Sequence, residues 1–365
     1  MDTRLSYSQI QCAKDCLRKH WFSYVIGLRP KAAPLAWQIG SWIHAGIEAL
    51  AALMTRDEIG LALDAATEPL DAELDATSDA DVRLVIGYQR AVVRAMLRGY
   101  AWRWAAMDRD MTINAVEQPF AMLIINPDSG RASTKWTLCG KIDALATMAG
   151  NQSVWERKTV SEDISPESDY WARLRIDSQI SLYFLAAQHI GYSPSSIWYD
   201  VLRKPLMRPA NIPQLDADGL KIAVDAYGIR VLLANGKPRQ SADKEKGIAL
   251  LTVPETPDTY EDRLVADIGE RPDHYFARRE FARVEDDVLE AQFELWQSMQ
   301  LINDCVNYGR WPRNTRSCLN RGKCSYFGIC TCGGYRDGDP VPDGFEIVSN
   351  THQEVETENE TGGSQ

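Results

Sequence analysis

The spacing of apolar residues changes along the chain from a helical period to a strand period. Residues 5–26 repeat apolar side chains at helical spacing, with Ser6 or Ser8 placed to cap the first turn. A second helix is expected after Gly40-Ser41, and residues 57–108 predict two or three further amphipathic helices. The first third of the chain is therefore expected to be mostly helical.

Strand-like alternation begins near residue 112. Residues 112–125, 135–148 and 151–158 predict three strands joined by short turns. A helix at about 171–190 and a strand at about 195–202 follow. The order β-β-β-α-β predicts an α/β protein with a small mixed sheet flanked by helices.

The last third of the chain has a less regular pattern. Residues 204–273 are rich in Pro, Lys and Asp, and we interpret them as an insertion with two helices, near 217–233 and 257–270. A strand near 274–283 and a long helix over 285–308 lead into a cysteine-rich end. We find no internal repeat.

Charge is distributed unevenly over the 365 residues, which carry a net −11 and an ordinary globular share of 45% hydrophobic residues. Residues 337–365 contain eight acids and no Lys or Arg, which predicts a disordered acidic tail. Residues 1–31 hold six bases against two acids, and residues 308–325 hold five bases and no acid. These two stretches would attract a polyanion despite the net charge, although a solvated charged surface explains either one alone.

The chain shows no signal for membranes or export. No apolar run approaches the roughly 20 residues that a membrane helix needs. The N-terminus lacks the basic-then-apolar pattern of a signal peptide. We therefore expect a soluble cytoplasmic protein without a membrane partner.

Two carboxylates and a lysine are expected to meet on one hairpin. Asp143 and Glu156 lie on consecutive predicted strands whose connecting turn contains the midpoint of the two positions, so they should face each other about 5 Å apart. Lys158 shares the strand face of Glu156, two residues away. Like charges this close need an offsetting cation, and carboxylate oxygens suit Mg²⁺ or Mn²⁺. An exposed salt-bridge cluster is the alternative interpretation, at even odds on spacing alone.

Other polar residues accompany this group along the chain. His44 lies in an otherwise apolar helix, where it is either a core histidine or a metal ligand. Glu117 is an acid within the first strand, where edge exposure is the simpler explanation. Gln179 and Tyr183 share a helix face. Ordinary helix capping and packing is the alternative explanation for this pair.

The order of these motifs resembles the RecB/AddB/Cas4 branch of the PD-(D/E)XK nuclease superfamily. The motifs are Gly140-x-x-Asp143, Glu156-x-Lys158 and Gln179-x-x-x-Tyr183, preceded by His44 and Glu117 and by the opening Ser6-Tyr7-Ser8. The likeness spans residues 5–332, with 204–273 matched least. It implies a restriction-endonuclease-like core with a helical N-terminal region, an inserted helical segment and a C-terminal cysteine-rich region.

The resemblance also implies roles for individual residues. His44, Asp143 and Glu156 would bind Mg²⁺ or Mn²⁺ together with the backbone carbonyl of Arg157. Lys158 would be the catalytic lysine. Gln179, Tyr183 and Glu117 would contact DNA or support the site. The proline that usually precedes the first aspartate is replaced by Ile142.

The eight cysteines of the chain point to metal binding and not to disulfides, because thiols in a reducing compartment stay reduced. Cys139 and Cys305 lie in apolar segments and are expected in the core. The resemblance implies that Cys16, Cys318, Cys324 and Cys330 hold a [4Fe–4S] cluster that joins the two chain ends, with Cys332 as the reserve third ligand. A local zinc site at Cys318, Cys324, Cys330 and Cys332 remains the alternative.

Five parts of the chain are expected on these grounds. They are a helical part with the first cluster cysteine (1–110), the catalytic core (111–203), the insertion (204–273), a helix with the cysteine-rich segment (274–336) and the acidic tail (337–365).

The leading functional hypothesis is a metal-dependent DNA nuclease, an exonuclease of DNA end processing, recombination, repair or phage metabolism, with a helicase or recombination protein as a possible partner. One alternative is a nucleic-acid-binding protein with a structural Fe–S or Zn site and no catalysis. Another is a structure-specific endonuclease with the same chemistry.

Overall fold

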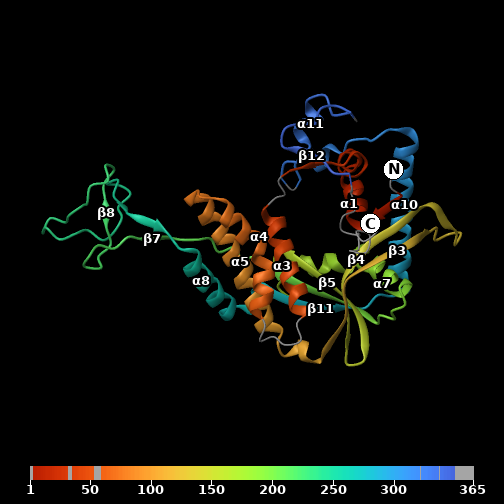
Figure 1. Cartoon of the computed structure of the whole chain (residues 1–365), viewed down its shortest axis with the longest axis horizontal. Coiled ribbons are helices and arrows are strands. Elements are labelled where there is room, and N and C mark those ends of the chain that lie inside the picture. Colours follow the sequence, from red (N-terminus) through yellow and green to blue (C-terminus); the bar gives the residue numbers. More distant parts are fainter. Residues whose placement is uncertain (1–2, 32–34, 53–58, 321, 337, 350–365) are drawn as a thin grey trace, which may run out of the picture. The chain divides into compact units, whose positions relative to one another are not determined.

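The computed structural model describes residues 3–31, 35–52, 59–320, 322–336 and 338–349 of the chain. The chain divides into two compact units, each made of segments that are distant in the sequence (Figure 1). The first unit comprises Met1–Gly40, Ala105–Leu202 and Phe276–Gln365. The second comprises Ser41–Trp104 and Arg203–Tyr275.

A six-stranded mixed sheet forms the centre of the first unit, with the order β1-β4-β5-β6-β11 and with β3 paired to β4. β1 runs parallel to β4, whereas the β3–β4, β4–β5 and β6–β11 pairs are antiparallel. The strands are β1 (Arg4–Ser6), β3 (Met111–Ile125), β4 (Ala132–Met148), β5 (Asn151–Val160), β6 (Ser196–Arg203) and β11 (Phe276–Phe281). The predicted α/β class with a small mixed sheet is confirmed.

Helices cover one face of this sheet and bury a large apolar core. α1 (Tyr7–Asp15), α7 (Ser178–His189) and α10 (Glu285–Tyr308) contribute Ile10, Ile180, Leu182, Leu295 and Ile302 to the same buried cluster as Leu145, Val154 and Val201 of the sheet. The long helix predicted over 285–308 is confirmed in its bounds. The apolar spacing that identified it also supplies its buried face.

Two of the predicted helices are interrupted by capping residues. The expected helix 5–26 is divided into β1, α1, α2 (Leu17–His20) and a π-helical turn (Trp21–Ile26), with Cys16 extended between α1 and α2. The expected helix 171–190 is divided into α6 (Asp169–Arg175) and α7, because Asp177 accepts a hydrogen bond from Gln179 N and starts a new helix. Apolar periodicity continued across both breaks, so it could not locate them.

The expected disorder from Asp337 onward is wrong for part of that segment. β12 (Phe345–Ile347) pairs antiparallel with β2 (Leu28–Pro30), and Phe345 packs on Tyr326 with ring centroids 5.6 Å apart. Gly27 allows this pairing, because it has φ of +77° and a Cβ there would lie 2.2 Å from the carbonyl oxygen of Val348. Residues 350–365 lie outside the described residues.

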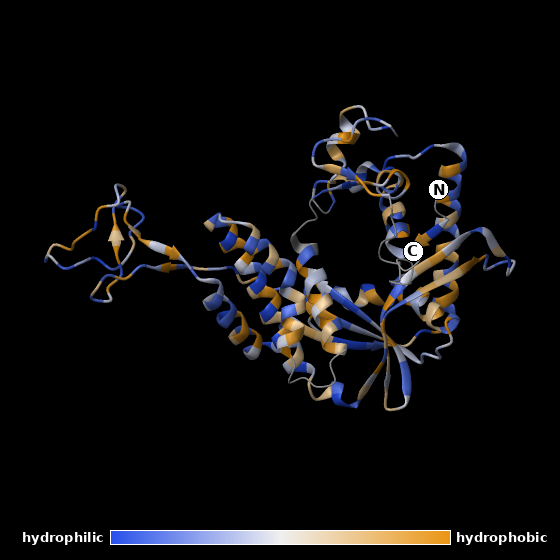
Figure 2. Cartoon of the chain, viewed as in Figure 1, coloured by the Kyte–Doolittle hydropathy of each residue, from blue (hydrophilic) through white to orange (hydrophobic). Residues whose placement is uncertain are grey.

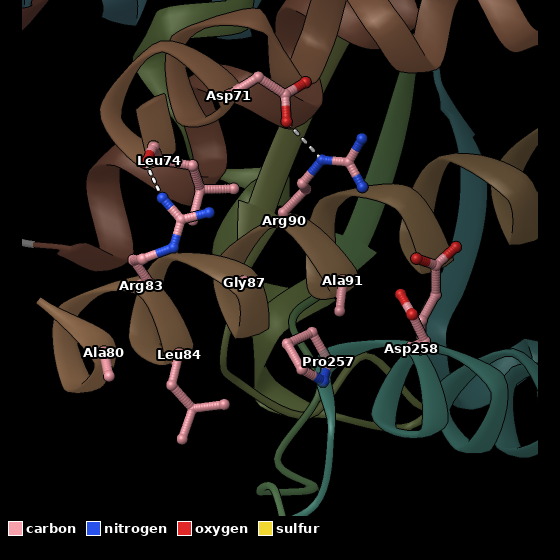
Figure 3. A pocket seen from close by; sticks show the side chains of 11 residues that line it. Asp71, Leu74, Ala80, Arg83, Leu84, Gly87, Arg90, Ala91, Pro257 and Asp258 are labelled. Carbon is pink, nitrogen blue, oxygen red and sulfur yellow. Dashed lines mark hydrogen bonds and ion pairs between the residues drawn. The ribbon is translucent and has the colours of Figure 1, made fainter. Parts of the chain in front are cut away.

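The second unit is built on helices. Its elements are α3 (Leu35–Ala52, from Ser41 onward), α4 (Ile59–Ala76), α5 (Ala80–Trp104), α8 (Pro257–Glu270) and α9 (Pro272–Tyr275). α5 packs against α4 and α8, and Gly87 provides the close approach to Pro257. An open pocket of about 480 Å³ lies among α4, α5 and α8, with the Asp71–Arg90 ion pair on its wall (Figure 3).

The insertion between β6 and α8 contains turns and short strands where a first helix was expected. α8 confirms the helix predicted at 257–270, but residues 217–233 form successive turns. Asp216 and Asp225 each accept backbone N–H bonds from the residues that follow, and Gly219 and Gly228 have positive φ. This Asp-Ala-x-Gly turn recurs after nine residues, a short recurrence that we did not find from the sequence.

Two antiparallel pairs of strands carry these turns. β7 (Asn211–Pro213) pairs with β10 (Thr252–Pro254), and β8 (Ala223–Val224) pairs with β9 (Ala249–Leu250). Figure 2 shows hydrophobic positions in the inserted segment, and Ile212 of β7 and Val253 of β10 are exposed.

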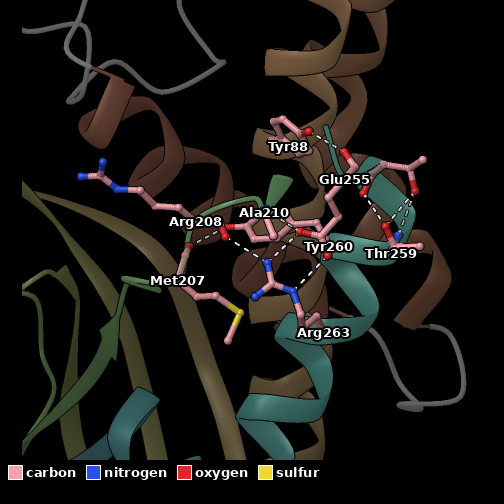
Figure 4. A network of polar contacts seen from close by, with 9 residues as sticks. Tyr88, Met207, Arg208, Ala210, Glu255, Thr259, Tyr260 and Arg263 are labelled. Atoms are coloured by element: carbon pink, nitrogen blue, oxygen red, sulfur yellow. Dashed lines mark hydrogen bonds and ion pairs between the residues drawn. The ribbon is translucent and has the colours of Figure 1, made fainter. Parts of the chain in front are cut away.

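At the base of the insertion, Arg263 of α8 donates to both carboxylate oxygens of Glu255 and to the carbonyl oxygen of Arg208 (Figure 4). These bonds anchor the inserted segment on the helices of its own unit.

No helix in the described ranges combines the length and the apolar character needed to cross a membrane.

Candidate active site

The β4–β5 hairpin brings Asp143 and Glu156 together. Its loop is Ala149-Gly150, and both residues have positive φ, the conformation that matches the twist of a two-residue hairpin. Ala144 pairs with Trp155, so Asp143 and Glu156 are the next residues in register. Asp143 Oδ2 accepts a hydrogen bond of 2.7 Å from the backbone N of Arg157, which ties the aspartate to the neighbouring strand.

Glu156 is a buried carboxylate with one satisfied and one unsatisfied oxygen. Its side chain is 3% exposed. Oε1 accepts from Lys158 Nζ at 2.6 Å and from Gln179 Nε2 at 2.8 Å. Oε2 is buried without a hydrogen-bond partner among the described residues. Burial and then the charge of Asp143 raise the pKa of Glu156 to about 8, against the opposing effect of Lys158.

Gln179 joins the lysine to the glutamate. Its Oε1 accepts from Lys158 Nζ at 2.7 Å while its Nε2 donates to Glu156, so one amide fixes both side chains. Burial acts to lower the pKa of Lys158, but Glu156 and Asp143 outweigh it and the pKa is raised. The lysine is therefore held as a cation between α7 and β5.

Tyr183 lies one turn after Gln179 on α7, close to the same group. Burial, followed by the charge of Glu156, raises its pKa well above the ordinary value. Its ring meets Phe120 edge-on at 5.7 Å. Phe120 in turn packs over Gly140, where a Cβ would lie 2.9 Å from the ring. The glycine of the Gly140-x-x-Asp143 motif is thus required for this aromatic packing.

Glu117 faces Asp143 across the β3–β4 pair. Val116 pairs with Ala144 and Gln118 with Ile142, which places Glu117 opposite Asp143. It has φ of 47°, a left-handed conformation that costs a non-glycine residue about 1–3 kcal/mol. Strain of this kind often occurs at functional sites, and a role for Glu117 beside the carboxylate pair stays a prediction.

His44 lies on α3, in the second unit. Its place in a metal site stays a prediction, as does the ligand role of the Arg157 carbonyl.

Two residues beside the site were not identified from the sequence as site residues. Asp177 caps α7 two residues before Gln179, and its Oδ1 accepts the Tyr7 hydroxyl at 2.8 Å. The Asp177-Ser178-Gln179 sequence is a helix N-cap signal, and reading it would have located both the helix start and this carboxylate.

The two chain ends are joined by hydrogen bonds in the first unit. Arg18 N donates to the carbonyl oxygen of Pro312 at 3.0 Å, and Asn314 Nδ2 donates to that of Asp15 at 2.9 Å. The described residues of the basic segments 1–31 and 308–325 are therefore joined around Arg18 and Pro312. Of the aromatic residues in these segments, Trp311 is buried and unavailable for stacking on bases, whereas Tyr308 is 77% exposed.

Cysteines from both ends meet at this junction. Cys12 interacts electrostatically with Cys16 and Cys324, and Cys330 interacts with Cys324 and Cys16. Burial raises the pKa of Cys12 to about 12 and also raises that of Cys330. All eight cysteines are free, and Cys139 and Cys305 are buried as expected. Cys318 Sγ lies 3.7 Å from the carbonyl oxygen of Asn314.

Over the described ranges, no three His, Cys, Asp or Glu side chains are arranged to hold a metal ion. The thiols are thus close but are not assembled as a cluster site. The hairpin offers two carboxylates, and the unsatisfied Oε2 of Glu156 beside Asp143 is a hard oxygen donor that a divalent cation would satisfy. The hairpin residues fit a magnesium or manganese ion.

A mixed sheet flanked by helices that places an aspartate, a glutamate and a lysine on one hairpin defines a restriction-endonuclease-like fold. The family model of the PD-(D/E)XK nuclease superfamily matches residues 4–331, and the chain belongs to this superfamily. It is therefore a metal-dependent nuclease by family, of a superfamily that uses Mg²⁺ or Mn²⁺ and acts on DNA.

The other comparisons add little. No curated protein matches the chain. A solved structure titled "Crystal structure of SSO0001" shares 11% identity over 72% of this chain and 85% of that chain, with a TM-score of 0.20. A likeness at this score supports no conclusion about function.

Proposed function

We propose that the protein is a RecB/Cas4-like DNA exonuclease that hydrolyses phosphodiester bonds at strand ends with Mg²⁺ or Mn²⁺. The observation that carries the proposal is the buried Oε2 of Glu156, which has no hydrogen-bond partner among the described residues, in a side chain whose pKa is raised by the charge of Asp143. A buried carboxylate in that state is costly unless a cation or proton offsets it.

Each residue of the hairpin has a separate task in this proposal. Asp143 and Glu156 hold the cation, with His44 and the Arg157 carbonyl as further ligands. The bound cation supplies charge neutralisation at the scissile phosphate and a more acidic water. Gln179 keeps Lys158 aligned, and Glu117 adds negative charge at the same point.

Lys158 is the residue that acts on the reacting groups. Its ammonium is held by Glu156 Oε1 and Gln179 Oε1 and has a third proton to direct at a substrate oxygen. A fixed cation there stabilises the negative charge that develops on the phosphate during in-line attack by water. The lysine thus orients the water or the phosphate.

The basic segments at the joined chain ends supply the affinity for DNA. Phosphate contacts by lysines and arginines release counterions, so binding should weaken steeply as salt increases. The exposed ring of Tyr308 offers a surface for an unpaired base.

Nuclease assays test the assignment directly. The wild type, Asp143→Asn and Lys158→Ala are compared on linear duplex, linear single-stranded and circular single-stranded DNA with Mg²⁺ or Mn²⁺. We expect the wild type to degrade the linear substrates and spare the circle, and both variants to lose activity. Lys135→Ala is the matched control, because Lys135 is an exposed lysine of β4 that donates to Asn303 Oδ1 of α10, and it should behave as the wild type.

Equal activity of the wild type and the two site variants would overturn the nuclease proposal. Cleavage of the circle would leave the chemistry intact and change the assignment to an endonuclease.

We further propose that Cys16, Cys318, Cys324 and Cys330 take up a [4Fe–4S] cluster, with Cys332 as the reserve ligand and Zn²⁺ as the alternative metal. What supports this is the proximity of the free thiols of Cys16, Cys324 and Cys330 from both chain ends, together with the raised pKa of Cys330, which a metal would lower. Thiolate sets of this kind suit Fe–S or zinc.

Anaerobic purification followed by metal analysis tests the cysteine proposal. We expect a brown protein with iron in the wild type and loss of iron and thermal stability in Cys16→Ala. Cys305→Ala is a control for a buried cysteine outside the junction. Unchanged iron content in Cys16→Ala would refute the shared site, and zinc without colour would replace the cluster.

A further inference from the structure

We propose that Asp177, held by the hydroxyls of Tyr7 and Tyr199, is a positioning residue that fixes the start of α7 so that Gln179 can align Lys158 with Glu156. This inference rests on the proposed nuclease function, since it concerns how the same site is kept in its working geometry.

Asp177 is bound from three separate elements. Its Oδ1 accepts the Tyr7 hydroxyl of α1 at 2.8 Å and the backbone N of Gln179 at 2.9 Å, and its Oδ2 accepts the Tyr199 hydroxyl of β6 at 3.4 Å. An N-cap residue needs only the hydrogen bond from a backbone N–H of the first turn, here that of Gln179. The hydrogen bonds from the two tyrosine hydroxyls come in addition, and they connect Asp177 to α1 and to the sheet.

The buried setting of these donors strengthens their hold on the carboxylate. Tyr199 is fully buried and Tyr7 packs against the main core. A buried hydroxyl without a partner costs about 1–3 kcal/mol, so each tyrosine is constrained to keep its bond to Asp177. Hydrogen bonds to an ionised acceptor are also stronger than neutral ones.

A short path leads from this anchor to the reacting groups. The Gln179 N–H bound by Asp177 belongs to the same residue whose side chain bridges Lys158 Nζ and Glu156 Oε1. Fixing the Gln179 backbone therefore fixes the Cα position from which that side chain extends. Since Oε1 of Glu156 is occupied by this bridge, Oε2 remains available for a cation.

The first residues of the chain place Tyr7 at this anchor. β1 pairs with β4 next to the hairpin, and Tyr7 begins α1 directly after β1. Ser6 caps that helix by accepting from Gln9 N. The Ser6-Tyr7 segment thus presents the tyrosine hydroxyl to Asp177.

The test combines kinetics with a measurement that needs no metal and no activity. Tyr7→Phe removes one hydroxyl and little else. We expect kcat to fall about tenfold with KM for DNA within about twofold, because the lysine is misaligned while DNA contacts are kept. In the metal-free protein, we expect acetylation of Lys158, followed by mass spectrometry, to become several-fold faster, as it should in Gln179→Ala.

Two comparisons separate positioning from simple structural support. Tyr275→Phe is the matched control, because Tyr275 is also buried and also donates its hydroxyl to a carboxylate, that of Asp267 in the second unit. It should leave kcat and Lys158 labelling unchanged. In the double variant Tyr7→Phe/Gln179→Ala, kcat should equal that of Gln179→Ala alone, since both changes act through one amide.

Unchanged Lys158 labelling in Tyr7→Phe, or additive losses in the double variant, would overturn the positioning role. If no form of the protein cleaves DNA, the nuclease proposal fails, while the labelling result still decides whether Tyr7 and Asp177 hold Lys158 in place.

Discussion

The central sheet carries two charged clusters of the same composition on its opposite faces, and only one of them looks like an active site. Each has two carboxylates and one cation: Asp143, Glu156 and Lys158 on one face, and Asp108, Asp200 and Arg278 on the other. Neighbouring residues of a strand point to opposite faces, so Trp155 packs under Arg278 while Glu156 joins the first cluster.

The two clusters differ in how the cation is shared. Arg278 is almost fully buried and binds both of its carboxylates, Asp200 at 3.0 Å and Asp108. Of its two neighbouring carboxylates, Lys158 donates to Glu156, whereas Asp143 accepts from the backbone N–H of Arg157. The two clusters therefore share a composition and differ in whether a single cation binds both carboxylates.

Glu156→Gln should produce the largest loss of DNA cleavage and should show that the two clusters have different roles. We expect activity to fall at least about 10³-fold, because the cation loses a charged ligand, while the metal-free fold becomes no less stable. DNA cleavage and thermal melting in EDTA measure the two quantities. A large fall in melting temperature would mean that Glu156 is structural like Asp200.

Arg278→Met should have the opposite profile. Removing the guanidinium leaves Asp108 and Asp200 buried without it, which typically costs about 3–5 kcal/mol. Chemical denaturation should show this loss of stability, and the remaining folded protein should keep its kcat and its metal dependence. Loss of cleavage with unchanged stability would contradict the division of roles between the faces.

The stability of the metal-free protein should depend on pH through Glu156. Its pKa is about 8 in the folded chain against 4.5 ordinarily, so the folded state holds a proton that the unfolded state releases. This contribution to stability falls as pH rises from about 4.5 to about 8. The melting temperature of Glu156→Gln minus that of the wild type should therefore increase from pH 5 to pH 8 in EDTA. A difference that is constant with pH would rule out the raised pKa.

Ser153→Ala should have the smallest effect and lies on the Arg278 face. Ser153 Oγ accepts from Trp155 Nε1 at 2.9 Å and donates to the carbonyl oxygen of Ala146. Its loss should cost about 1 kcal/mol by denaturation and leave cleavage unchanged. A change in cleavage rate would show that the two faces are coupled through β5.

The hairpin of the site could be predicted because its information is local. Alternation fixes which residues share a face, and the Ala149-Gly150 loop fixes the register, so the Asp143–Glu156 pair follows from the sequence. The bridge through Gln179 could be anticipated only as a shared helix face with Tyr183. Which oxygen it would occupy depends on packing of α7 against the sheet.

Interactions between distant segments could not be predicted in this way. Tyr7 and Asp177 are 170 residues apart, and nothing in either neighbourhood specifies the other. β12 pairs with β2 although its surrounding composition is acidic, because Phe345 finds an aromatic neighbour in Tyr326. The inserted turns resembled a helix in their apolar spacing, but the Asp and Gly positions decide the backbone there.

Calorimetric titration of Mn²⁺ into EDTA-treated protein is the most direct test of the hairpin as a cation site. We expect saturable binding to the wild type and to Arg278→Met, and none to Glu156→Gln or Asp143→Asn. Equal binding of Mn²⁺ to the wild type and to both hairpin variants would contradict the account.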